Sequence, residues 1–200
     1  MAVVAPIFPS GEGVGFDGGC TVASPPIFLA EDEALKVIRD ELDQAGIKLS
    51  AKNVSVGTII IPPHLYFVKD PTGGCSNELG RDIPPPRLFL ADLADPHKHV
   101  AIEFVSLRGN FELGKFWKQP TARYLDFKTA AARIASLVKQ HGRGFYFGAF
   151  YDPAGFGLPG DPRSGRDSND MVTVKRALNI ELLREQVKGF VEWLKFQGAI

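Results

Sequence analysis

Residues 144–151 read Gly144-Phe145-Tyr146-Phe147-Gly148-Ala149-Phe150-Tyr151 and are dominated by aromatic side chains. Aromatic residues favour β-strands, in which successive side chains point to opposite faces of the sheet. Because apolar groups fall on both faces of this segment, it predicts a strand that is buried on both sides, in the middle of a sheet.

Helical periodicity of apolar residues marks three other segments. The first covers 31–45, after an acidic first turn that suits the helix dipole. The second lies between Asp126, a good N-terminal cap, and Gly142, a typical stop. We expect the third to be capped by Asn179 and to end at Gly198. The sequence therefore predicts three main helices.

Strand-like segments occur at 53–61, 88–92 and 98–107, without regular alternation of strands and helices. This order predicts an α+β fold, in which three helices pack on one face of a mixed or mostly antiparallel sheet. Residues 1–26 are rich in glycine and proline, and we expect them to form an irregular N-terminal arm. Residues 27–200 then form a single domain.

Composition narrows the class of protein. The chain has 200 residues, 44% of them hydrophobic, which is enough for the core of one domain. Its 23 acidic and 23 basic residues balance. The basic residues do not cluster in the sequence as they would in a nucleic-acid-binding protein, so we do not expect nucleic-acid binding. No apolar run has the length of about 18 residues that a membrane span needs. We therefore expect a soluble protein, of unknown oligomeric state.

The densest group of metal-ligating residue types lies at 92–103. His97 and His99 are two residues apart, so on a strand they would share a face and could clamp one divalent metal ion, with Asp95 nearby. The alternative is that residues 95–98 form a polar turn between two antiparallel strands, because Asp-Pro initiates turns. We favour the turn and expect no cofactor other than this possible metal.

The same stretch resembles the first motif of the cupin family in His97, His99, Glu103 and the later Gly109. This resemblance implies a small β-barrel that holds iron, manganese or zinc. The chain departs from the pattern, because an extended strand places Glu103 about 13 Å from His99. Three predicted helices also disagree with an all-β barrel.

Other catalytic sets are incomplete. A nuclease-type site built on Asp92 and Glu103 needs a lysine two residues after the glutamate, where Val105 stands. The chain has no Gly-x-Ser-x-Gly sequence for a serine nucleophile. The sequence therefore favours a protein that is not an enzyme, without deciding the question.

Both cysteines follow a Gly-Gly pair in a polar segment, at Cys20 and Cys75. Such settings are more typical of a disulfide or of exposed thiols than of core cysteines. We favour a Cys20–Cys75 disulfide, and with it an extracytoplasmic over a cytoplasmic location. The alternative function for the pair is redox response.

Two long polar segments, 69–87 and 152–170, are predicted to be loops, and long loops commonly carry function. We expect them to bind a protein, peptide or glycan. The candidate binding residues are Tyr151, Asp152, Phe156 and Arg163. A non-enzymatic binding domain is thus the first functional hypothesis, and a metal-dependent enzyme or a redox-responsive protein are the alternatives.

Overall fold

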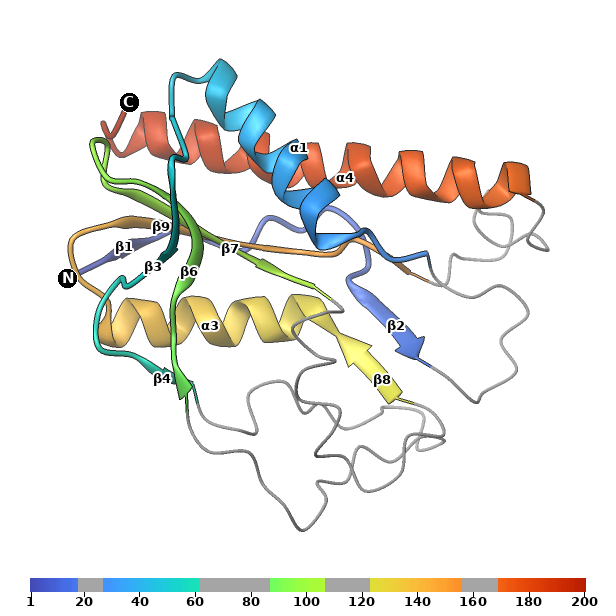
Figure 1. Ribbon diagram of the computed structural model, residues 1–200, viewed down its shortest axis with the longest axis horizontal. Coiled ribbons are helices and arrows are strands. Elements are labelled where there is room, and N and C mark those ends of the chain that lie inside the picture. Colours follow the sequence, from blue (N-terminus) through green and yellow to red (C-terminus); the bar gives the residue numbers. More distant parts are fainter. Residues whose placement is uncertain (18–26, 62–86, 107–122, 156–168) are drawn as a thin grey trace, which may run out of the picture.

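The computed structural model describes residues 1–17, 27–61, 87–106, 123–155 and 169–200. The strands of its main sheet are β1 (Val3–Val4), β3 (Ala51–Val54), β6 (Ala91–Asp95), β7 (Val100–Val105) and β9 (Tyr146–Tyr151). They lie in the order β1-β9-β7-β6-β3 (Figure 1).

The sheet is mixed. β9 runs parallel to both of its neighbours, with Val3 opposite Tyr146 on one side and Ile102 opposite Gly148 on the other. β6 is antiparallel to β7 and to β3. The prediction that residues 144–151 form an interior strand is therefore confirmed.

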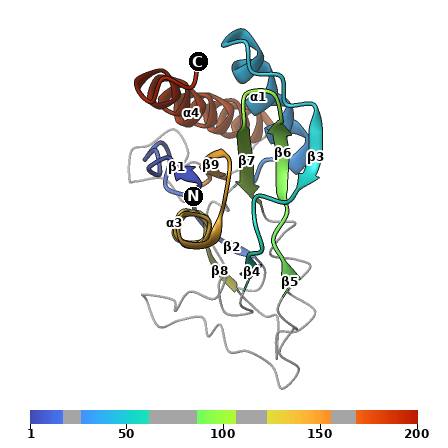
Figure 2. The ribbon, with the colours of Figure 1, turned by 90° about the vertical axis from the view of Figure 1, so that its left-hand side faces the viewer.

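Helices cover both faces of this sheet, rather than the single face expected from the sequence (Figure 2). The described helices are α1 (Glu31–Gln44), α3 (Phe127–His141) and α4 (Asn169–Phe196). α3 packs on one face, where Phe127 and Ile134 meet Phe147 in one core. α1 and α4 pack on the other, where Ile38 and Phe190 meet neighbouring strand residues in a second core. The α+β class predicted from the sequence is confirmed.

The N-terminal segment is the first correction. Within residues 1–26, expected to be irregular, Val3–Val4 forms β1, and Val14–Asp17 forms β2, which pairs with β8 (Arg123–Asp126). The partners of these strands lie more than a hundred residues later in the chain. A pairing of this range leaves no local pattern that sequence periodicity could detect.

Both predicted ends were correct for α3, whereas for α4 the end near Gly198 was correct and the start at Asn179 was wrong. Asp126 caps α3, because its carboxylate accepts a hydrogen bond from the Thr129 backbone N–H at 2.8 Å. Asn179 lies in the interior of α4 rather than at its start. Its side-chain amide instead donates to the Ile27 carbonyl at 2.7 Å, so a distant partner replaces the local cap.

The expected strand at 53–61 is divided into β3 and β4 (Ile60–Ile61), and β4 pairs with β5 (Arg87–Leu88). Gly57, between them, has φ +143°, which other residues rarely adopt. A Cβ atom there would lie 2.8 Å from the His141 carbonyl oxygen, so glycine also allows this close approach. None of the helices in the described ranges is both long enough and apolar enough to cross a membrane.

Candidate functional site

Two predicted binding residues, Tyr151 and Asp152, lie at the end of β9 and are completely buried. The Asp152 carboxylate accepts hydrogen bonds from two backbone N–H groups, Leu29 at 2.7 Å and Ala154 at 2.9 Å. A ligand cannot contact a side chain in this position unless the chain rearranges. In the structure, Asp152 holds the segment that leads into α1 against the end of β9.

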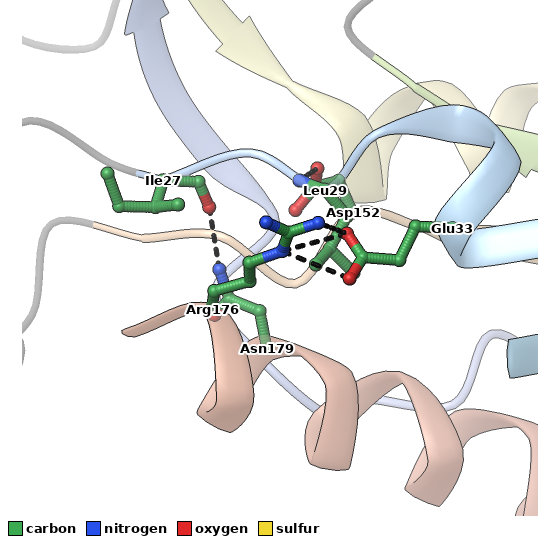
Figure 3. Close-up of polar contacts among 6 residues, drawn as sticks. All are labelled: Ile27, Leu29, Glu33, Asp152, Arg176 and Asn179. Carbon is green, nitrogen blue, oxygen red and sulfur yellow. Dashed lines mark hydrogen bonds and ion pairs between the residues drawn. The ribbon is translucent and has the colours of Figure 1, made fainter. Parts of the chain in front are cut away.

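Further polar contacts fix the same segment (Figure 3). Beside the bond from Asn179 to Ile27, the Arg176 guanidinium forms two parallel hydrogen bonds with the Glu33 carboxylate at 3.0 and 2.8 Å. Residues 27–33 are therefore tied to α4 by the Asn179 and Arg176 side chains and to the end of β9 by Asp152, the residue that follows it.

Tyr151 holds a different part of the N-terminal segment. Its hydroxyl lies 3.3 Å from the Phe8 carbonyl oxygen, to which it donates, and its backbone N–H donates to Gln186 at 3.2 Å. Burial raises the pKa of Tyr151 to about 12, with a smaller effect from Asp126. The other two predicted binding residues, Phe156 and Arg163, lie outside the described residues.

The predicted turn at 95–98 is present between β6 and β7. The Asp95 carboxylate accepts the backbone N–H groups of His97 at 2.9 Å and Lys98 at 3.0 Å, as well as that of Lys48 at 2.7 Å. Burial opposes ionisation of Asp95, but these bonds outweigh it, so its pKa is lowered. His97 and His99 are exposed, and His99 has φ +53°.

The structure does not bring Asp95, His97 and His99 together as the ligands of one metal ion. Asp95 is committed to the turn, and neither His97 nor His99 is in a strand, so strand periodicity does not place them on one face. Across the described ranges, no group of three or more His, Cys, Asp or Glu side chains is arranged to hold an ion. A metal site at His97 and His99 remains a prediction.

Asp92 and Glu103, two other carboxylate residues, lie at the opposite end of the same hairpin. Asp92 accepts the backbone N–H of Phe104 at 2.8 Å, and Glu103 accepts the backbone N–H of Asp92 at 3.2 Å. These reciprocal bonds extend the contact between β6 and β7 beyond the last backbone pair, Leu93 with Ile102. The sequence suggested this pair, but only strand register shows that the two residues are neighbours.

Glu31, the first residue of α1, adds negative charge to this end of the sheet. Its carboxylate accepts a hydrogen bond from the Ser106 hydroxyl at 2.8 Å. Burial raises the pKa of Asp92 to about 6, the Phe104 hydrogen bond opposes the rise, and the charge of Glu31 adds to it. The carboxyl ends of β7 and β9 lie here, because the Asp152 N–H donates to the Val105 carbonyl at 3.2 Å. In sheets with parallel strands, ligands commonly bind at this edge.

The raised pKa values of Asp92 and Asp152 predict how stability depends on pH. Burial raises the pKa of Asp152 to about 7, against an ordinary value of 3.8. From about pH 4 to pH 7 the folded chain therefore binds more protons than the unfolded chain, and the free energy of unfolding falls as pH rises. We expect a loss of about 4 kcal/mol between pH 5 and pH 7.5, measured by urea denaturation.

A matched variant separates this effect from other titrations. Asp92→Asn combined with Asp152→Asn should remove most of the slope between pH 5 and pH 7.5. Asp95 should not contribute there, because its lowered pKa affects stability only below about pH 4. Stability that rises over the same interval would contradict the burial of these two carboxyls.

Comparisons with known proteins give no relative. No protein-family model, curated protein or solved structure matches the chain. Cys20, Cys75 and most of the two predicted binding loops, 69–87 and 152–170, lie outside the described residues. The disulfide, the redox response and binding through those loops therefore remain predictions.

Proposed function

We propose that this protein is a divalent-cation-dependent enzyme, in which Asp92 and Glu103 bind Mg²⁺ or Mn²⁺ beside a phosphate-bearing substrate. One observation carries the proposal: Asp92 and Glu103, on neighbouring strands, each accept a backbone N–H of the other strand near the carboxyl end of β7. Proteins usually bind Mg²⁺ through one or two carboxylates, water molecules and substrate phosphate rather than through a complete cage of side chains. Two carboxylates therefore suffice for this type of site.

Electrostatics support the same assignment. Asp92 has a pKa of about 6 because it is buried and lies near the Glu31 charge, so its ionised form is disfavoured. A cation bound there would relieve this cost, because an opposite charge favours the ionised carboxylate. In such a site the cation would lower the pKa of a bound water and so supply the nucleophile for hydrolysis. We expect cation affinity to fall below about pH 6, where Asp92 takes up a proton.

Isothermal titration with MgCl₂ and MnCl₂ tests the proposal. Asp92→Asn combined with Glu103→Gln should weaken cation binding at least tenfold. The amide oxygens of the new side chains can still accept the Phe104 and Asp92 backbone N–H groups, so the fold should be retained. Unchanged thermal unfolding without cation would verify this.

His97→Ala combined with His99→Ala is the matched control, since it removes two metal-ligating side chains from the other end of the hairpin. Its cation affinity should equal that of the wild type. Hydrolysis of bis(p-nitrophenyl) phosphate should be lost with EDTA and in the Asp92/Glu103 variant. Absence of cation binding by the wild type, or its loss only in the histidine variant, would refute the proposed site.

A further inference from the structure

A polar cleft of about 670 Å³ lies at the other end of the molecule, between the C-terminal end of α3 and the connection from β3 to β4. Its walls include Ser55, Gly57, Thr58, His141 and Arg143. These segments are adjacent on the left of Figure 1, where α3 ends. The volume is in the range of small-molecule sites.

The backbone of this cleft is fixed by the fold. The Arg143 backbone N–H donates to the Val56 carbonyl at 2.7 Å, and the Gly142 N–H donates to Val138 at 2.7 Å. Gly57 packs against the His141 carbonyl more closely than any residue with a Cβ atom could. The two walls are therefore held together by main-chain contacts, independently of the Asp92 and Glu103 site.

The side chains around the cleft carry positive charge and hydroxyl groups without acidic residues. Arg143 and His141 are exposed, and no carboxylate in the described part of the chain forms an ion pair with either. Basic residues in the last turn of a helix commonly offset its dipole, which accounts for His141. Arg143 follows the helix end at Gly142, so this explanation does not extend to it.

We infer that this cleft binds a small molecule through an oxyanion, a phosphate or a carboxylate. A guanidinium group presents parallel N–H donors that match both groups, and a charge-assisted bond of this kind is stronger than a neutral one. The Thr58 hydroxyl on the facing wall can donate a further hydrogen bond.

Amide chemical shifts recorded during titration with inorganic phosphate test this inference. We expect saturable shifts at residues 55–58 and 141–143. Arg143→Gln should weaken binding at least tenfold, and Arg143→Lys should weaken it less, because lysine keeps the charge but not the paired donors. Arg39→Gln, on α1, is the matched control and should bind as the wild type does.

A second titration with acetate identifies the oxyanion, since tighter binding of phosphate than of acetate assigns a phosphoryl group and the reverse assigns a carboxylate. Shifts that do not saturate, that map elsewhere, or that persist in Arg143→Gln would overturn the site. This result is independent of the cation titration, because neither Asp92 nor Glu103 lines the cleft.

Discussion

Replacement of Asp152 by alanine is expected to lower the free energy of unfolding by about 3 kcal/mol at pH 5. The change removes the acceptor of the Leu29 and Ala154 N–H groups, and the donor at Leu29 lies in a residue that is only 3% exposed. Leaving a buried donor without a partner costs about 1–3 kcal/mol. Urea denaturation measures the loss, and Asp40→Ala, at an exposed position of α1, should change stability by less than about 0.5 kcal/mol.

The same variant should become less destabilising as pH rises. At pH 8 the wild type buries a charged carboxylate, because the pKa of Asp152 is about 7, whereas at pH 5 its carboxyl is neutral in the folded state. Alanine removes that cost together with the hydrogen bonds. A penalty that grows between pH 5 and pH 8 would show that Asp152 is stabilised as an anion, contrary to the effect of its burial.

Replacement of Phe190 by alanine is expected to cost about 4 kcal/mol, a typical loss for an aromatic residue removed from a packed core. Phe190 is completely buried between α4 and the sheet. Its ring stacks on Trp193 at 5.6 Å between centroids and meets the edge of Phe150 at 5.5 Å. It also covers Gly148, where a Cβ atom would lie only 2.9 Å from the ring.

Phe196→Ala is the matched control, because the same residue type lies on the same helix with 85% of its surface exposed. We expect it to change stability by less than about 0.5 kcal/mol. Near-UV circular dichroism should change for Phe190→Ala alone, since of the two phenylalanines only Phe190 packs against Trp193. Equal effects of the two substitutions would contradict the packing of α4 on β9.

Local signals predicted the parts of the fold that depend on neighbouring residues. Asp126 lies three residues before the N–H that it caps, and the Asp95 turn closes within three residues, so both could be read from sequence. Asn179 shows the limit of this reasoning. It has the chemistry of a cap, but a carbonyl 152 residues away in sequence accepts its amide hydrogen bond, and the helix begins earlier.

Sequence patterns did not predict the contacts of residues whose partners lie far away in the chain. Asp152 resembles the first residue of an exposed loop, because an aspartate is seldom fully buried without partners. Its two backbone donors provide those partners, and one of them is 123 residues away. The pairing of Asp92 with Glu103 likewise depends on the register of β6 and β7, which composition does not reveal.

The place of β9 in the sheet also bears on how the chain folds as it is synthesised. Val3 and Val4 have their strand partners at Tyr146 and Phe147, and β7 needs the same strand along its whole length. Contacts of such high sequence separation slow folding, because a long loop must close before they form. Until residues 146–151 leave the ribosome, β7 presents an unpaired edge on which another chain could pair. Chaperone dependence during translation is the expected consequence of placing the interior strand so late.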